Sequence, residues 1–149
     1  MISDVNKYLI LIKHDLTLFD LLTGPLPAHV AKENFSDWQV TNLFYMACIF
    51  LKSACALFGE DVQDHFTLRR IINNRKELFS IAKNYRHLEE ASRDARYEGR
   101  VFEKQYILDR LVPKFNSVRD CIVDLLTKNN VQNIPVIQIE SFLNRNKLT

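Results

Sequence analysis

The segment that most constrains the fold runs from Ser36 to Phe58, because it predicts a helix that is apolar on almost every side. Gly59 follows it and is the residue type that commonly ends a helix in the left-handed conformation. Apolar side chains occupy one face and much of the opposite one: Ala47, Cys48, Leu51, Ala54, Cys55 and Phe58, then Met46, Ile49, Phe50 and Leu57. A helix with so little polar surface is buried. We therefore expect it at the centre of a helical bundle, or covered by a second copy of the chain.

The remaining segments also predict helices, because only three glycines and four prolines occur and the β-branched residues are scattered. Apolar residues at helical spacing predict a first helix over about 3–22. Asp64 is expected to cap a third, shorter helix, and Gly99 to end a long fourth one. A last helix is expected over about 102–128, where Pro113 must kink the helix or start a new one.

The ends of these elements and the chain length complete the predicted architecture. Ser36 or Asp37 is expected to cap the second helix. Residues 131–139 are expected to be extended and to precede a short helix at 141–145. A chain of 149 residues is long enough for one substantial core and too short for two full domains. We therefore expect one all-α domain over residues 1–149, an up-and-down bundle of four to five main helices.

Charge and cysteine content limit the classes of function. The chain has 20 basic and 18 acidic residues, a net charge of +2, so binding of nucleic acid requires a local basic patch. The near-apolar run over 43–51 is too short to span a bilayer, and the first residues lack a signal-peptide pattern, so we expect a cytoplasmic protein without membrane contact. Cys48, Cys55 and Cys121 form no CxxC motif and are expected to be reduced thiols, mostly buried.

The common sequence motifs of enzyme and cofactor sites are missing from this chain. The three glycines stand alone, so there is no glycine-rich phosphate loop. There is no HExxH motif and no cluster of cysteine and histidine, so no metal site is expected. There is also no GxSxG motif to mark a nucleophilic serine. We expect no cofactor, and the sequence leaves the catalytic residues unassigned.

A group of arginines and tyrosines near the end of the fourth predicted helix is the strongest candidate for a binding site. Arg86, Arg93, Arg96 and Tyr97 lie within a segment whose other face is apolar. The planar guanidinium group holds phosphate oxygens in pairs, and a neighbouring aromatic ring suits a nucleotide. The alternative is a solvated helix face, in which interleaved glutamates and aspartate pair with the arginines as ordinary neighbours.

A histidine and an arginine at the start of the third predicted helix extend this candidate site. His65 and Arg69 are four residues apart, so their side chains share one face of the helix and can meet a common anion. The alternative for the histidine is a first-turn residue that bonds to a loop or to a neighbouring carboxylate. The candidate ligand-binding residues are His65, Arg69, Tyr85, Arg86, Arg93, Arg96 and Tyr97.

Four motifs, in this order, together resemble the HEPN superfamily of helical domains. They are Asp37-Trp38 at the start of an apolar helix, Asp64-His65 with Arg69, Tyr85-x-x-Leu88, and Ser92-x-x-Ala95-Arg96-Tyr97. The resemblance covers roughly residues 36–97 closely and the flanking helices only through their helical pattern. It implies a four- or five-helix bundle that commonly forms a homodimer. Many such domains are ribonuclease toxins, or partners of minimal nucleotidyltransferases in toxin–antitoxin and phage-defence systems.

The chain departs from the family at its catalytic motif. Active HEPN ribonucleases have an arginine followed by a histidine after four to six intervening residues, and no pair here has that spacing. The resemblance therefore implies a non-catalytic module that binds nucleotide or RNA phosphate and dimerises through its second helix. One alternative is a divergent metal-independent endoribonuclease, in which His65 or His87 is the general base and Arg93 or Arg96 holds the phosphate. The other is a purely structural protein-interaction module.

Overall fold

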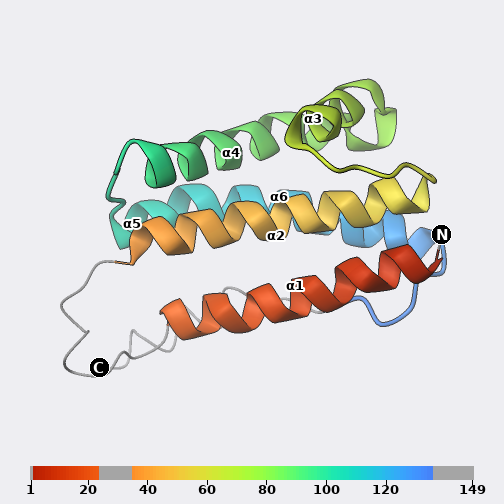
Figure 1. Cartoon of the computed structure of the whole chain (residues 1–149), viewed down its shortest axis with the longest axis horizontal. Helices are drawn as coiled ribbons and strands as arrows, with labels where there is room; N and C mark the ends of the chain where they lie inside the picture. Colours follow the sequence, from red (N-terminus) through yellow and green to blue (C-terminus); the bar gives the residue numbers. More distant parts are fainter. Residues whose placement is uncertain (1, 24–34, 136–149) are drawn as a thin grey trace.

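The described part of the chain folds as an all-α, up-and-down bundle with five helices of ten or more residues, as the sequence predicted (Figure 1). The computed structural model describes residues 2–23 and 35–135, and these contain no β-strand. The predicted short helix at 141–145, and positions 136–139 of the predicted extended segment, lie outside the described residues. The helical segments are α1 (Ile2–Thr23), α2 (Ser36–Leu57), α3 (His65–Asn74), η1 (Lys76–Ile81), α4 (Ala82–Tyr97), α5 (Lys104–Tyr106), η2 (Ile107–Leu111) and α6 (Val112–Lys128).

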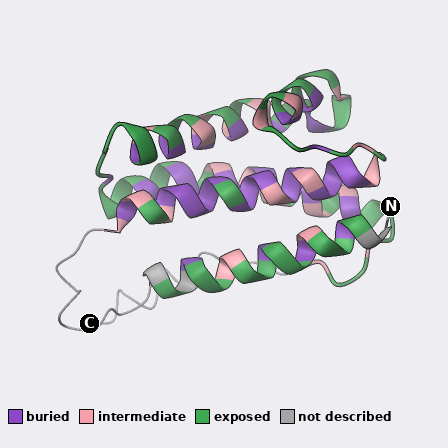
Figure 2. Cartoon of the chain, viewed as in Figure 1, coloured by how far each residue is buried: buried purple, intermediate pink, exposed green. Residues whose placement is uncertain are grey.

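Helix α2 lies at the centre of the bundle. It packs against α1 on one side and against α4 and α6 on the others, and α1 has no comparable contact with α4 (Figure 1). Most of its residues are buried, in contrast with the outward sides of α1 and α4 (Figure 2). By length and hydropathy alone α2 could cross a bilayer, but 78% of its most apolar window is buried inside the bundle, which is the pattern of a core helix.

The bundle core is formed by apolar stripes that face α2 from each neighbouring helix. Phe50 of α2 and Phe115 of α6 are fully buried, and their ring centroids lie 6.2 Å apart in an edge-to-face arrangement. Such a pair contributes about 0.5–1.5 kcal/mol beyond the burial of its area. The buried side chains of α1 include those of Val5, Leu9, Ile12 and Phe19, which repeat at helical spacing. The predicted first helix is thus confirmed, and its apolar face packs against α2.

The start of α2 differs from the prediction that Ser36 or Asp37 caps it. Phe35 occupies the N-cap position, and no side chain there accepts a hydrogen bond from the first turn. Ser36 is buried inside the first turn, and its hydroxyl accepts a hydrogen bond of 3.0 Å from the backbone N–H of Phe102. This residue ties the start of α2 to the segment before α5. Its partner is 66 positions away along the chain, so local sequence signals could not reveal the bond.

Two predicted helix boundaries are found where the sequence placed them. The Asp64 carboxylate accepts a 2.7 Å hydrogen bond from the backbone N–H of Thr67, which caps the start of α3. Gly99, with a φ angle of 63°, follows the end of α4 in the left-handed conformation. The predicted long fourth helix begins differently, because residues 76–81 form the tighter 3-10 helix η1 before α4 starts.

The kink expected at Pro113 takes the form of a π-helical turn, η2. The backbone N–H of Val112 bonds to the carbonyl of Ile107, five residues earlier. Proline has no N–H, and its ring would clash with the carbonyl four residues before it in a regular helix. The wider π turn removes this conflict, so that helical structure continues from α5 into α6.

Candidate functional site

The residues proposed from the sequence meet at one open cavity of about 710 Å³ over α2, α3 and α4. Six of the seven candidates line it, two from α3 and four from α4. The lining residues are Phe44, Tyr45, His65, Arg69, Arg86, Glu89, Glu90, Arg93, Arg96 and Tyr97. Positively charged side chains from separate helices therefore surround a shared hollow. That these residues bind a ligand remains a prediction.

Helix α3 contributes His65 and Arg69 to the cavity. The Asp64 cap fixes the first turn of α3, and the four-residue spacing places both side chains on the face toward α4. Arg69 Nη1 forms an ion pair of 2.7 Å with Glu89 Oε1 of α4. The arginine side chain is 47% exposed and the glutamate 16%, so this pair links the two helices at the edge of the cavity.

Helix α4 contributes two arginines that have no bonding partner among the residues that the structure describes. Arg86 and Arg93 are seven residues apart, a rise of about 10.5 Å along the helix. Both are exposed, and neither forms an ion pair or a hydrogen bond with any of residues 2–23 or 35–135. Their guanidinium groups can therefore bind an anion without first breaking a hydrogen bond or an ion pair within residues 2–23 and 35–135.

Arg96, in contrast, is held in place by its neighbours. Its Nη1 donates a hydrogen bond of 3.0 Å to the Tyr45 hydroxyl, and its Nε donates one of 3.2 Å to the Ser92 carbonyl. The guanidinium carbon lies 5.4 Å from the ring centroid of Tyr45 and 5.0 Å from that of Tyr97. Tyr97 is 70% exposed, so one end of the cavity presents a fixed cation between two aromatic rings.

Tyr85 is the one predicted site residue that the structure does not bring into the cavity. It is 1% exposed and lies below the cavity floor, where its ring centroid is 5.7 Å from that of Phe44. Its hydroxyl is 3.3 Å from Cys48 Sγ, and burial raises the pKa of the phenol further above its usual value. The helical period alone placed Tyr85 on the buried face of α4, and it contacts other core residues there.

His65 lies between the buried side chains of Tyr85, Cys48 and Phe44 and the open cavity. Its Nδ1 is 3.8 Å from Cys48 Sγ, and its ring centroid is 5.4 Å from that of Phe44. Burial is the main cause that lowers the pKa of the imidazole below 6.5, and the nearby cations Lys52, Arg96 and Arg69 lower it as well, against the opposing effect of Glu89. The imidazole is therefore mostly neutral at neutral pH.

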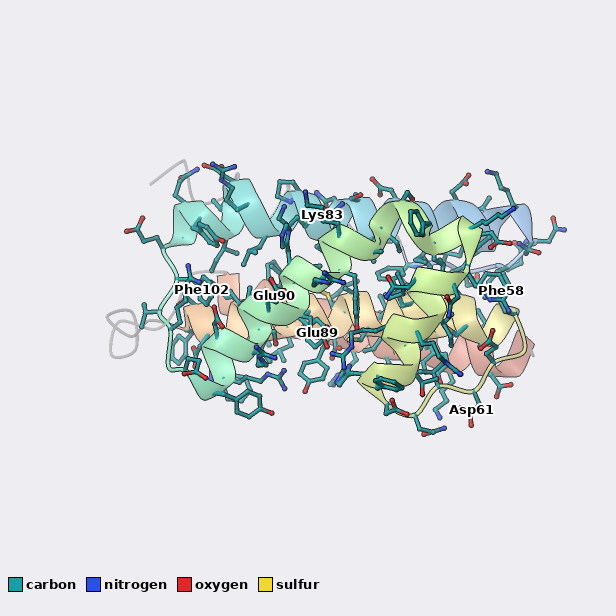
Figure 3. All side chains as sticks on the ribbon, turned by 90° about the horizontal axis from the view of Figure 1, so that it is seen from above. Phe58, Asp61, Lys83, Glu89, Glu90 and Phe102 are labelled. Carbon is teal, nitrogen blue, oxygen red and sulfur yellow. The ribbon has the colours of Figure 1, made fainter. Side chains whose placement is uncertain are left out.

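The lining of the cavity is positively charged overall. Four arginines face two glutamates, which gives a net charge of two when the imidazole is neutral. In Figure 3, Glu89 lies on the side of α4 that faces α3, and Glu90 lies farther from α3. This excess of cations favours an anionic ligand.

Four lining residues were not among the predicted site residues. Phe44 and Tyr45 belong to α2, where the sequence indicated only a core helix, although a tyrosine often keeps its hydroxyl at a polar boundary. Glu89 and Glu90 entered the sequence analysis only in the alternative of a solvated helix face, as neighbours of the arginines on their own helix. Glu89 instead pairs with Arg69 of α3, 20 residues away.

The second histidine considered as a general base lies in a different place. His87 lines a separate cavity of about 450 Å³ between α4 and the segment that runs from α5 into α6. It therefore does not share a cavity with Arg93 or Arg96. Among the described residues, no group of three His, Cys, Asp or Glu side chains is arranged to hold a metal ion.

Comparison of the chain with protein-family models, with curated proteins and with solved structures gave no match.

Proposed function

We propose that this chain is a non-catalytic HEPN-like module whose cavity binds the phosphate groups of a nucleotide or of RNA. The observation that carries the proposal is the meeting of six predicted site residues from α3 and α4 at one cavity, where Arg86 and Arg93 have no partner among the described residues. A charged group without an internal partner gains more from an anionic ligand than one that is already paired.

The cavity offers contacts for both parts of a nucleotide. Arg86 and Arg93 offer exposed guanidinium groups to phosphate oxygens. Tyr97 and Tyr45 flank the fixed Arg96, and exposed aromatic and guanidinium planes are surfaces on which unpaired bases stack. Phosphate contacts along α4, together with base stacking beside Arg96, support a single-stranded ligand.

Replacing Arg86 and Arg93 tests the proposal. Fluorescence anisotropy with a labelled single-stranded RNA is measured for wild type and for the double variant Arg86→Ala/Arg93→Ala, over a series of salt concentrations. We expect at least a roughly tenfold loss of affinity, about 1.4 kcal/mol. The slope of log affinity against log salt should fall in magnitude by about 1.4, since each lost phosphate contact contributes about 0.7.

The matched control is Arg70→Ala/Lys83→Ala. It also removes two exposed positive charges from α3 and α4, but neither residue lines the cavity. Equal weakening by both double variants would mean that the RNA responds only to the net charge of the chain. That result, or binding by wild type that does not depend on salt, would overturn the proposal in favour of a protein-interaction module.

The alternative of a divergent endoribonuclease is supported by one observation. His65 is largely neutral and shares its cavity with arginines that can hold a phosphate, which are the groups that metal-independent cleavage requires. Incubation of RNA with wild type and with His65→Ala tests this activity. Cleavage by wild type that the variant loses would establish it, whereas no cleavage, or equal cleavage by both, would exclude it.

The wider biological role is part of the same proposal. A place in a toxin–antitoxin or phage-defence system, with a nucleotidyltransferase-type partner, is tested by co-purification from the native host and mass spectrometry of the bound protein and nucleotide. A homodimer is tested by sedimentation at micromolar concentration, where a 17.5 kDa species alone would exclude it. Helices α1, α4 and α6 cover most of the apolar surface of α2, so a dimer contact through this helix would use its exposed residues, such as Trp38.

A further inference from the structure

Three polar side chains form a connected row beneath the cavity. The Tyr85 hydroxyl is 3.3 Å from Cys48 Sγ, and Cys48 Sγ is 3.8 Å from His65 Nδ1. Tyr85 is 1% exposed and Cys48 is 2% exposed, so water does not compete for these groups. The row runs from the core of α4 through α2 to the first residue of α3.

The direction of the hydrogen bonds in this row can be worked out by counting hydrogens. Among the described residues, Cys48 is the sole hydrogen-bond partner of the Tyr85 hydroxyl. If the phenol donates to the sulfur, the thiol is free to donate to His65 Nδ1, and every buried hydrogen has an acceptor. If the thiol instead donates to the phenol oxygen, the buried phenol hydrogen has no acceptor. A buried donor without an acceptor costs about 1–3 kcal/mol.

The protonation states of the row agree with this direction. Burial raises the pKa of the Cys48 thiol to about 12, so the sulfur keeps its hydrogen at neutral pH. Burial also lowers the pKa of His65, so the imidazole is neutral and has one nitrogen with a hydrogen and one without. Nδ1 accepts from the thiol, and the hydrogen therefore lies on Nε2. Nε2 has no hydrogen-bond partner among the described residues. It is also not buried, since the buried polar atoms that lack a partner are all in other residues, so it is accessible from the cavity.

We infer that Cys48 and Tyr85 are positioning residues that hold His65 as the Nε2–H tautomer, so that the cavity is given a neutral hydrogen-bond donor and not a general base. The inference rests on the proposed function for the identity of the ligand. It narrows the ligand to one that presents an oxygen acceptor beside the imidazole, such as an unprotonated phosphate oxygen. It also disfavours the nuclease alternative, because Nε2 has no free lone pair with which to take a proton.

The tautomer can be measured without any ligand. Nitrogen-15 NMR of the histidine side chains distinguishes a ring nitrogen that carries a hydrogen from one that does not. Above the pKa of His65, at pH 7.5, we expect one tautomer, with the hydrogen on Nε2 and a bare Nδ1. A spectrum in which Nδ1 carries the hydrogen, or in which the two forms are mixed in wild type, would overturn the inference.

Substitutions at Cys48 test whether this residue sets the tautomer. Cys48→Ala removes the donor and should give a mixture of the two forms, whereas Cys48→Ser keeps a hydroxyl donor and should restore the single form. Cys55→Ala is the matched control, since Cys55 is a buried thiol on the same helix without a bond to His65. A single Nε2–H form in Cys48→Ala would remove the positioning role of Cys48.

The result of the tautomer measurement can be distinguished from the result of the RNA-binding test. If RNA fails to bind but the wild-type spectrum shows the Nε2–H form, the proposed function is wrong and the hydrogen-bond row stands. If RNA binds as expected but the spectrum shows a hydrogen on Nδ1, the row is wrong and the binding site stands. Wild-type spectra decide the tautomer even where a Cys48 variant does not fold.

Discussion

Neutralising one acidic residue of the cavity should strengthen the binding of an anion. Glu89→Gln removes one of the two negative charges that line the cavity, so the net charge there rises from two to three. Glutamine keeps an oxygen that can accept the hydrogen bond from Arg69, so the link between α3 and α4 is retained. The loss of the ion pair should change the free energy of unfolding by less than about 1 kcal/mol, because Arg69 is 47% exposed.

The size of the expected gain follows from Coulomb's law. Two unit charges about 7 Å apart interact by about 0.6 kcal/mol in water and by about 2.4 kcal/mol at an effective dielectric constant of about 20. Removal of the repulsion between Glu89 and a bound phosphate should therefore raise the affinity between about 3-fold and about 60-fold. The gain should be larger at low salt, because added ions screen the repulsion.

Fluorescence anisotropy with a labelled single-stranded RNA measures this gain. The control is Glu77→Gln, which makes the same change in net charge at an exposed position in η1, outside the cavity. Circular dichroism of both variants checks that the fold is unchanged. An affinity for Glu89→Gln that equals that of wild type, or that the control matches, would refute the argument that the cavity itself binds the anion.

Three further predictions concern the fold and its thiols. Phe115→Ala should lower the free energy of unfolding by about 3–5 kcal/mol in urea denaturation, because the side chain is fully buried against α2, and a loss below about 1 kcal/mol would contradict this packing. Asp64→Ala should lower the melting temperature at neutral pH, because the Asp64 carboxylate caps α3. Its hydrogen bonds to Thr67 lower the pKa of this carboxyl in the folded state, so its contribution is present above the ordinary pKa of 3.8 and is lost as the pH falls through the lower, folded value. The difference in melting temperature between wild type and variant should therefore shrink on acidification, and a difference that stays constant would argue against the cap. At pH 8 a thiol-specific reagent should modify Cys121, which is partly exposed, before Cys48 and Cys55, because burial raises the pKa values of these two thiols to about 12. Fast modification of all three thiols in the folded protein would contradict the burial of Cys48 and Cys55 in α2.

The helices could be predicted from the sequence because their signals are local. The apolar period of α1, the Asp64 cap of α3 and the glycine after α4 each depend on residues within a few positions of one another. The central position of α2 followed from its lack of a polar face. Such signals do not report contacts between helices, so the bond between Ser36 and Phe102 was missed.

The candidate site was predictable in part, for the same reason. The shared face of His65 and Arg69, and the outward arginines of α4, follow from helical spacing within one segment. The pairing of Arg69 with Glu89, and the place of Tyr45 beside Arg96, depend on how α2, α3 and α4 pack together. Helical periodicity predicts on which face of its own helix a residue lies. It does not predict which residue of a neighbouring helix that side chain contacts.

All the side chains that line the cavity come from residues 44–97, on the helices α2, α3 and α4. Helix α1 covers the opposite side of α2 and supplies none of them (Figure 1). Substitutions on the outer surface of α1 can therefore alter solubility or association with other molecules while ligand selectivity stays the same. Residues on the α1 side and residues on the cavity side of the bundle can therefore change independently, because α2 lies between the two sides.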